Sequence, residues 1–213
     1  DSLKDVGGFV GGTLKDGIRK AQNVLSRSLI TLDLDNMKEE YTEDVYRSID
    51  LLGYRALVYS TRKHQSHKPR LRIVFPLEKD CSREEYEPIA RMLGSRLGID
   101  LCDPTTFEAS RLMYFPSICK GADYVYKVFD GEEVNAEKVL GLYHDWKNVA
   151  EWPKCQSENL LIRREITKQG NPLEKSGLIG AFCKAYDIPS AIEHFLSGIY
   201  LPTDRPDRYT YAD

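Results

Sequence analysis

The chain has 213 residues, of which 41% are hydrophobic, 30% charged and 10% aromatic. This composition is typical of a folded globular protein and excludes a disordered tail, a collagen-like fibre and a coiled-coil rod. No apolar run approaches the roughly 18 residues that cross a bilayer, so we expect no membrane partner. The five scattered cysteines form no CxxC pair, which argues against a zinc ribbon or a disulfide scaffold and favours the reducing cytoplasm.

The charges are distributed unevenly along the chain. Lys and Arg total 30 and Asp and Glu total 33, which gives a net charge of −3 at pH 7 and does not by itself indicate a nucleic-acid-binding protein. Between Arg55 and Leu77, however, there are six basic side chains and no acidic one. A short basic segment on an acidic protein favours a local site for phosphate groups over a long nucleic-acid groove.

The first half of the chain alternates between strand and helix patterns. The glycine-rich opening, GGFVGGTLKDG, is expected to be a loop, and it lacks the Lys-Ser/Thr pair that follows the last glycine of a P-loop. Residues 28–35 are an apolar strand candidate, and Asn36 is expected to cap a helix that runs to Gly53. Residues 55–60 and 70–77 are the next two predicted strands.

The second half begins with a helix and ends with shorter helical pieces. Ser82 and Glu85 have the spacing of a capping box, and the helix that they begin is expected to end at Gly98. A fourth strand is predicted at 111–116, a further strand at 123–129 and a helix at 134–147. Two short amphipathic helices are expected in the segments GLIGAFCKAY and PSAIEHFL.

The order strand, helix, strand, strand, helix, strand predicts the fold class. It is the split βαβ arrangement of ferredoxin-like and RNA-recognition-motif-like sheets, an α+β fold in which the first and third strands are central neighbours. We expect a catalytic domain over residues 1–150, with extra strands and helices, and a small, mostly helical accessory segment over residues 151–213. Such a sheet also forms the palm of many polymerases, although fold alone does not determine function.

Asp33 and Asp35 are the clearest candidates for a functional site. Side chains two apart on a strand share a face, so Leu32 and Leu34 are expected to point into the core and both carboxylates to emerge on the opposite face. Two carboxylates this close repel each other unless a cation lies between them. Hard oxygen ligands of this kind suit Mg²⁺ or Mn²⁺. The alternative is a solvated loop in which one aspartate caps the following helix.

The basic loop between the second and third strands is the next candidate. His64 could bind a phosphate or position a metal-bound group, and a metal pair of His64 with His67 is conceivable. Arg70 and Arg72 lie two apart on the third strand, so we expect both on one face beside the aspartates. The alternative for this loop is a solvated basic hairpin.

Two residues after the second helix complete the set of candidates. Asp103 could bring a third carboxylate to the metal ions, although an Asp-Pro pair is also an ordinary turn. Arg111 opens the fourth predicted strand and could reach a phosphate, or could instead form an ion pair.

The chain resembles the primase-polymerase domain of phage and prophage replication proteins, within the archaeo-eukaryotic primase superfamily. Such domains often precede a helicase of the virulence-associated protein E kind. The matching segments cover most of the chain; they are GGFVGGTLKDGIRK, SRSLITLDLDN, VYSTRKHQSHKPRLRIVFPL, DPTTFEASRLMYFPS and NPLEKSGLIGAFCKAY.

The resemblance implies roles for individual residues. The superfamily uses a paired acid on a strand, a small-x-histidine element and a third acid, and Asp33, Asp35 and Asp103 match the acids. A strict frame from Ser60 would place the histidine at Arg62, so the histidine role falls to His64. The residues expected to bind nucleotide are Ser60, Thr61, Arg62, His64, Arg70, Arg72 and Arg111.

The resemblance implies a template-directed nucleotidyltransferase, a DNA primase or polymerase that uses two divalent ions, Mg²⁺ or Mn²⁺. Its expected partners are a DNA template or primer, nucleoside triphosphates and a helicase domain in the same full-length protein, in the cytoplasm of a bacterium or phage-infected host. The first alternative is a phosphatase of the haloacid dehalogenase kind, although the chain lacks the Asp-Asp pair and the strand order of that fold. The second is a non-catalytic module that binds nucleic acid or mediates assembly.

Overall fold

The computed structural model describes residues 7–158, 172–174, 177–203 and 208–212. The chain forms two compact units, Asp1–Asn159 and Leu160–Asp213. The predicted domain boundary near residue 150 lies within the first unit, in the 3-10 helix η7 (Val149–Glu151). Residues 159–171, 175–176, 204–207 and 213 of the predicted accessory segment lie outside the described residues.

The first unit is built on a five-stranded sheet in the order β2-β3-β5-β4-β7, and every neighbouring pair is antiparallel. Its strands are β2 (Gly12–Leu14), β3 (Val24–Leu34), β4 (Ala56–Ser60), β5 (Leu71–Cys81) and β7 (Tyr126–Phe129). The helices α1 (Thr42–Leu52) and α2 (Arg83–Leu97) follow β3 and β5 in the chain. The α+β class is confirmed, and β3 and β5 are the central neighbours that the split βαβ order requires.

The predicted fourth strand does not join this sheet. Only Met113–Tyr114 form a strand, β6, which pairs with β1 (Gly8–Phe9) in a separate two-stranded sheet, while β2 occupies the edge position beside β3. The expectation of a loop for the glycine-rich opening was therefore wrong. A Cβ atom on Gly12 would lie 2.0 Å from the Ser26 oxygen, so the glycine is what allows β2 to approach β3 so closely.

The two main helices begin and end for local reasons. The predicted cap at Asn36 was wrong, because Asn36 instead donates its backbone N–H to the Leu101 oxygen at 3.2 Å, and α1 begins at Thr42. It ends at Gly53, which adopts a φ of 68° that favours glycine. The capping box of α2 is confirmed, since Ser82 accepts from the Glu85 N–H and donates its own N–H to the Glu85 carboxylate.

The predicted helix over 134–147 is shorter in the structure. Helix α3 spans Ala136–Leu140, and turns follow in which the N–H groups of His144 and Asp145 donate to the Glu151 carboxylate, each at 3.1 Å. This carboxylate thus replaces the helical acceptors. The remaining 3-10 helices of the first unit are η2 (Lys15–Gly17), η3 (Ala21–Asn23), η4 (Glu39–Tyr41), η5 (Ile99–Leu101) and η6 (Pro104–Phe107).

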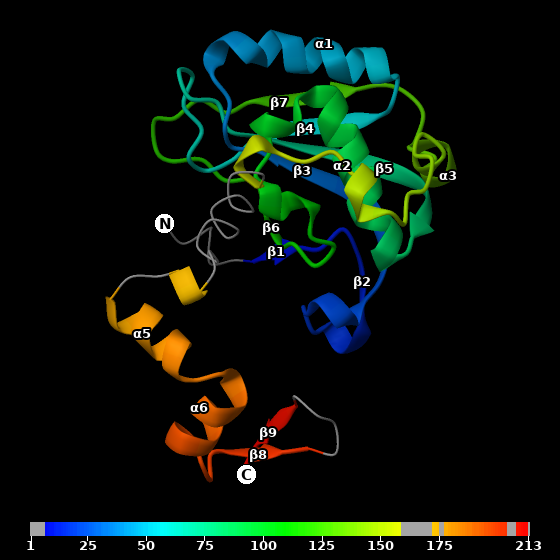
Figure 1. Ribbon diagram of the computed structural model, residues 1–213. Helices are drawn as coiled ribbons and strands as arrows, with labels where there is room; N and C mark the ends of the chain where they lie inside the picture. Colours follow the sequence, from blue (N-terminus) through cyan, green and yellow to red (C-terminus); the bar gives the residue numbers. More distant parts are fainter. Residues whose placement is uncertain (1–6, 159–171, 175–176, 204–207, 213) are drawn as a thin grey trace. The chain divides into compact units, whose positions relative to one another are not determined.

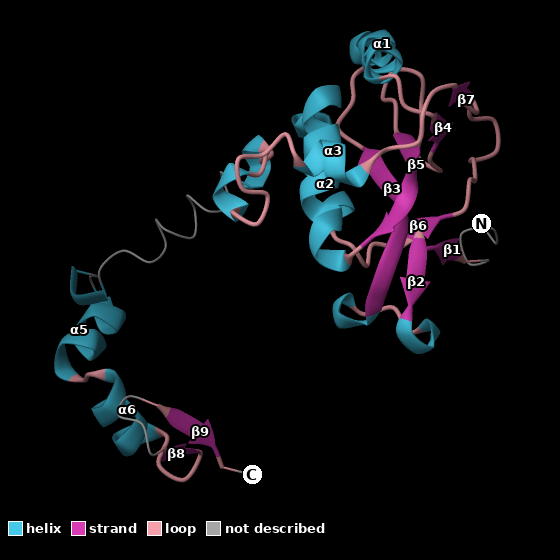
Figure 2. Cartoon of the chain, turned by 90° about the vertical axis from the view of Figure 1, so that its right-hand side faces the viewer, coloured by secondary structure: helices cyan, strands magenta, loops and turns pink. Residues whose placement is uncertain are grey.

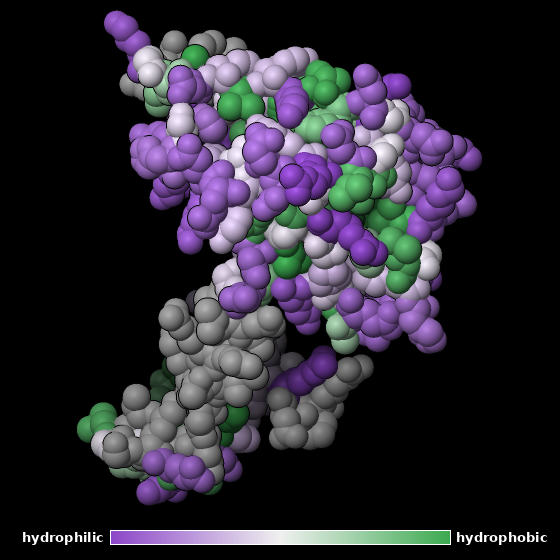
Figure 3. All heavy atoms as spheres, turned by 90° about the horizontal axis from the view of Figure 1, so that it is seen from above, coloured by the Kyte–Doolittle hydropathy of each residue, from purple (hydrophilic) through white to green (hydrophobic). Residues whose placement is uncertain are grey.

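One hydrophobic core lies between the sheet and its helices. Ile30, Leu32 and Leu34 of β3 are fully buried in it, together with Ile49 of α1 and Ile89 of α2. Figures 1 and 2 show α2 on one side of the sheet and β1 and β6 on the other, so the two faces of the sheet have different neighbours. The surface over α1 is mostly hydrophilic, with smaller hydrophobic patches between the polar side chains (Figure 3).

The second unit contains the two predicted helices and a hairpin that the sequence patterns did not indicate. Its elements are η8 (Pro172–Glu174), α5 (Gly177–Ala185), α6 (Ile188–Phe195), β8 (Tyr200–Pro202) and β9 (Tyr209–Tyr211). The rings of Tyr186 and Phe195 pack against Phe182, with centroids 5.2 and 5.6 Å from it. In the described parts of both units, no helix is long and apolar enough to cross a membrane.

Candidate active site

The alternation of β3 places the first two acids as predicted. Leu32 and Leu34 are fully buried in the core beneath the helices, and Asp33 points to the opposite face of the sheet, where its exposed fraction is 8%. Asp35 follows at the end of the strand and is partly buried. The interpretation of these residues as a solvated, capping loop does not describe them, because neither aspartate caps α1.

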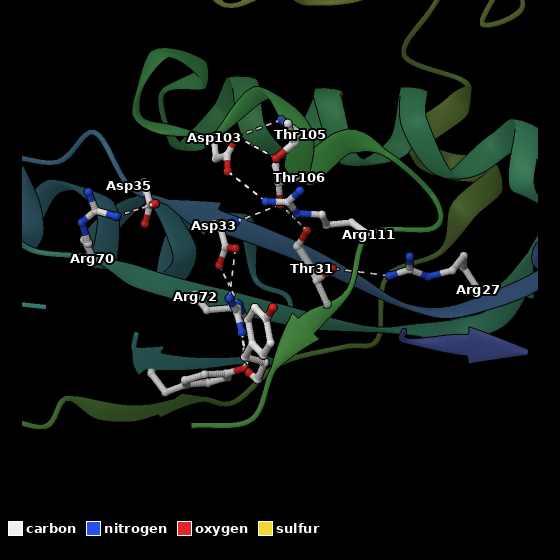
Figure 4. A network of polar contacts seen from close by, with 12 residues as sticks. Arg27, Thr31, Asp33, Asp35, Arg70, Arg72, Asp103, Thr105, Thr106 and Arg111 are labelled. Atoms are coloured by element: carbon white, nitrogen blue, oxygen red, sulfur yellow. Dashed lines mark hydrogen bonds and ion pairs between the residues drawn. The ribbon is translucent and has the colours of Figure 1, made fainter. Parts of the chain in front are cut away.

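Each of these acids is bound by an arginine of β5 or of the loop before it. Asp33 and Arg72 are direct partners in the antiparallel register, and the guanidinium donates to both carboxylate oxygens, at 2.6 and 3.0 Å. Arg70 donates to Asp35 at 2.7 Å. The two arginines therefore lie beside the aspartates, as the strand order predicted (Figure 4).

Backbone contacts along the outer edge of β3 bring the third acid to the first two. The Asp103 backbone N–H donates to the Asp33 backbone carbonyl at 2.8 Å. The buried Thr106 hydroxyl accepts from the Asp33 backbone N–H and donates to the Thr31 backbone carbonyl, each at 3.0 Å. Among the described residues, no strand of the sheet pairs with this part of the β3 edge; an isolated bridge joins Leu34 to Cys102, and the segment around η6 satisfies the polar groups.

Asp103 has a local and a long-range role. One carboxylate oxygen accepts from the N–H and hydroxyl of Thr105, which makes Asp103 the cap of η6. The other oxygen accepts from Arg111 at 3.3 Å. The turn and ion-pair interpretations of Asp103 and Arg111 are thus both correct, and both side chains also face the same pocket as Asp33 and Asp35.

This pocket has a volume of about 240 Å³. Its polar lining combines three carboxylates with five cations, and three aromatic residues form part of its wall. The lining residues are Asp33, Asp35, Tyr59, Thr61, Arg62, Lys63, Arg70, Arg72, Asp103, Arg111, Tyr114, Phe115 and Ser117. Of the predicted site residues, only Ser60 and His64 are not in this lining.

Ser60 and His64 instead support the neighbouring loop. The buried Ser60 hydroxyl accepts from the Val125 N–H at 3.0 Å. His64 is 5% exposed, and its Nδ1 atom accepts from the Arg70 N–H at 3.1 Å. His64 lines a second, basic pocket of about 650 Å³ that shares Arg62, Lys63 and Arg70 with the first. His67 lines the second pocket too.

Burial and charge determine the electrostatics of the first pocket, which we call the acidic pocket because it contains Asp33, Asp35 and Asp103. Burial raises the pKa of Asp35; the charge of Arg70 lowers it, and the charges of Asp33 and Asp103 raise it again. The Asp35 carboxylate is therefore close enough to those of Asp33 and Asp103 to be repelled by both. Burial alone would lower the pKa of Arg72, but the hydrogen bonds and charge of Asp33 raise it, so this arginine remains charged.

Several lining residues were not among the predicted site residues. Tyr59 accepts a hydrogen bond from Arg72 at 3.2 Å, and the Tyr114 carbonyl accepts another at 2.6 Å. Lys63, Phe115 and Ser117 complete the walls. Their signals in the sequence were weak, although Lys63 belongs to the basic segment and Tyr114 and Phe115 to the predicted fourth strand.

The chemistry of the donor set fits a hard divalent cation, since three carboxylates face one pocket and two of them repel the charge of the third, Asp35. As the side chains stand, no three His, Cys, Asp or Glu residues in the described part of the chain form a group that could hold a metal ion. Each of the three aspartates is instead turned towards an arginine.

Comparison with known proteins identifies the family. The sequence profile of the VapE N-terminal domain matches residues 1–155. The chain belongs to this family. The predicted resemblance to virulence-associated protein E-like replication proteins is thereby confirmed.

Two further comparisons add little to the VapE N-terminal domain assignment. No curated protein gives a significant match. A solved structure, the AEP domain (PP-N190) of the cyanophage S-2L primase-polymerase, is 12% identical with a TM-score of 0.43. The similarity covers 59% of this chain and 64% of that chain, and a similarity of this size carries no argument about function. The antiparallel sheet argues against the dehalogenase-like alternative, which needs a parallel one.

Proposed function

We propose that this VapE N-terminal domain is a template-directed nucleotidyltransferase, a DNA primase or polymerase. The observation that supports this most directly is the single pocket in which Asp33, Asp35 and Asp103 face Arg70, Arg72 and Arg111. Nucleotide transfer needs carboxylates for cations and arginines for phosphates within reach of one another.

In this proposal Asp33, Asp35 and Asp103 hold two divalent ions, Mg²⁺ or Mn²⁺. Bound there, such ions lower the pKa of an attacking 3′-hydroxyl and stabilise the charge on the leaving pyrophosphate. Coordination requires the three carboxylates to give up part of their contact with the arginines.

The arginines released in this way are the proposed ligands of the triphosphate. A guanidinium matches phosphate oxygens with two parallel N–H donors, as it matches carboxylates. Thr61 and Arg62 line the same pocket and are proposed to contact the nucleotide as well. Ser60 and His64 are proposed to act through the loop, because the Ser60 hydroxyl and His64 Nδ1 accept from backbone N–H groups.

The test is the incorporation of a labelled nucleotide on primed and unprimed DNA with Mg²⁺ or Mn²⁺. We expect incorporation by the unmodified chain and none by the Asp33→Ala, Asp35→Ala double variant. A matched control, Asp44→Ala with Asp50→Ala on the exposed side of α1, should retain it. Because the double variant also loses the partners of Arg70 and Arg72, the milder Asp33→Asn, Asp35→Asn variant is measured beside it.

A second measurement separates metal binding from turnover. Mn²⁺ should raise the melting temperature of the unmodified chain, since a ligand that binds only the folded state stabilises it. The Asp33→Asn, Asp35→Asn variant should show a much smaller rise. Incorporation that survives in a folded double variant would disprove the proposed role of the acids.

The ion pairs favour one second candidate, a non-catalytic nucleic-acid-binding module. In that case the three arginines neutralise the three aspartates permanently and the site never takes up metal. Such a module would bind DNA but would show neither incorporation nor a Mn²⁺-dependent rise in melting temperature.

The remaining partners follow from the family resemblance. We propose that the domain works with a helicase domain in the same full-length protein, on a DNA template or primer and nucleoside triphosphates. Co-purification of incorporation and DNA-unwinding activities from the full-length protein would test this arrangement.

A further inference from the structure

The edge strand β7 and the residues just before it carry an exposed row of large side chains, on the face of the sheet that also bears Asp33. Tyr124, Tyr126 and Val128 are 47%, 61% and 55% exposed. Lys127 lies between Tyr126 and Val128 and points to the helix side of the sheet, since its ammonium group lies 4.1 Å from the ring centroid of Tyr46 in α1. Period-two alternation therefore places the row on the side of the sheet away from the helices.

The register of β4 and β7 connects this row to the candidate active site. Tyr59 pairs with Tyr126 and Leu57 pairs with Val128, so each pair projects to the same face. Tyr59 lines the acidic pocket and accepts a hydrogen bond from Arg72. The exposed row thus lies on the same face of the sheet as the pocket residue Tyr59, on the neighbouring strand.

The start of the row is held in place by β4. The Val125 N–H donates to the Ser60 hydroxyl at 3.0 Å, and the Ser60 N–H donates to the Val125 oxygen at 2.9 Å. These two bonds fix the backbone on both sides of Val125, between Tyr124 and Tyr126. The aromatic rings are therefore carried by an ordered backbone, which reduces the entropy lost when a ligand packs on them.

The basic pocket borders the start of the row, because Ala122 and Asp123, directly before Tyr124, are among its lining residues. The basic pocket is lined by Arg62, Lys63, Lys68 and Lys120. Asp123, the one acidic residue among the described residues of its lining, accepts a hydrogen bond from Ser66 at 2.7 Å. Exposed aromatic rings next to a cluster of cations are the combination that binds single-stranded nucleic acid, because bases stack on the rings and phosphates contact the cations.

We propose that Tyr124, Tyr126 and Val128 form a base-stacking platform for a single nucleic-acid strand, whose phosphates contact the basic pocket. The proposal rests on the proposed function in one respect, namely that such a strand leads to the acidic pocket. Duplex DNA does not fit this role, since its bases are already stacked and paired. A protein partner is disfavoured by the basic pocket and by the two tyrosines, which offer flat rings to bases.

Fluorescence anisotropy with a labelled oligo(dT) strand, without metal or nucleotide, tests the platform on the full chain. Tyr126→Ala should weaken binding about fivefold or more, the effect of about 1 kcal/mol of lost base stacking. Tyr126→Phe should bind within about twofold of the unmodified chain, because the ring is what stacks. The matched control is Tyr41→Ala, a tyrosine that is 38% exposed and lies just before α1.

Each outcome decides the proposal. A fivefold loss with Tyr126→Ala, rescue by Tyr126→Phe and no effect of Tyr41→Ala support the platform. No oligo(dT) binding by the unmodified chain, or equal binding by Tyr126→Ala, overturns it. A Tyr126→Ala variant that changes the oligomeric state in solution but not oligo(dT) affinity overturns it too, and assigns the row to a protein interface.

The same experiment separates this proposal from the proposed function. Binding is measured without metal, so loss of incorporation in the Asp33→Asn, Asp35→Asn variant does not affect the result. If oligo(dT) binding depends on Tyr126 but no nucleotide is ever incorporated, the platform stands and the polymerase function fails. If incorporation is normal in Tyr126→Ala with unchanged oligo(dT) affinity, the function stands and the platform fails.

Discussion

Arg72 is the residue on which the geometry of the candidate site depends most. Its guanidinium binds both oxygens of Asp33, the Tyr59 hydroxyl and the Tyr114 carbonyl. It therefore connects β3, β4 and β6 from its own position on β5. The side chains of Arg72 and Asp33 are only 7% and 11% exposed, so each compensates the buried charge of the other.

Removing this arginine alone should be costly. Arg72→Met leaves the Asp33 carboxylate buried without its cation, and we expect a loss of about 3 kcal/mol in the free energy of unfolding. The Arg72→Met, Asp33→Asn double variant should recover much of this loss, because neither member of this pair is then charged. Urea unfolding measures both, with Arg47→Met as the control at an exposed ion pair. A single variant as stable as the unmodified chain would contradict the argument.

At the level of elements, α2 anchors the end of the first unit. Arg91 of α2 donates to the carboxylates of Glu87 and Glu158 and to the Pro153 carbonyl, and its guanidinium lies 4.6 Å from the ring centroid of Phe107. The segment that leads to Glu158 is thus bound to α2, and also to η5, where the Gln156 N–H donates to the Asp100 carboxylate at 2.6 Å.

The Arg91–Glu158 ion pair makes the free energy of unfolding depend on pH in the acid range. Burial would raise the pKa of Glu158, but hydrogen bonds from Arg91 and from the Cys155 N–H hold it below its ordinary value of 4.5. As pH falls, Glu158 therefore becomes protonated in the unfolded chain before it does in the folded one. Its contribution to the free energy of unfolding is present above pH 4.5 and is lost as pH falls below that value. Urea unfolding over this range should show a flatter acid dependence for Glu158→Gln than for the unmodified chain. The control Glu39→Gln, on the exposed turn η4, should leave the slope unchanged.

On the scale of the whole molecule, the first unit contains all of the main hydrophobic core. The core extends from Ile30 to Cys155, and the VapE N-terminal domain profile ends at the same residue. The unit defined by its internal contacts continues to Asn159 and so includes Glu158.

We expect a chain that ends at Asn159 to fold by itself. It retains the core and the Arg91–Glu158 pair, so it should unfold in one cooperative thermal transition followed by circular dichroism. A chain that ends at Asn148 loses buried Cys155 and Glu158 and should melt at a lower temperature. Equal melting temperatures would show that the residues between the two ends do not belong to the folded unit, and would favour the predicted boundary near residue 150.

The sequence alone determined the features that depend on neighbours along the chain. The alternation of Leu32, Asp33, Leu34 and Asp35 predicted which side chains enter the core, and the Ser82–Glu85 spacing predicted the start of α2. The order of strands and helices predicted that Asp33 and Arg72 would share a face. These inferences succeed because strand periodicity and helix capping are local properties.

Only the tertiary structure decided the features that depend on distant backbone contacts. The hydrogen bond from the Asp103 backbone N–H to the Asp33 backbone carbonyl joins residues 70 positions apart, and no local pattern indicates it. The same holds for the pairing of β1 with β6, which removes the predicted fourth strand from the sheet. Such contacts form where folding brings unpaired backbone groups together, and the satisfaction of those buried groups, rather than any motif, decides which segments line the pocket.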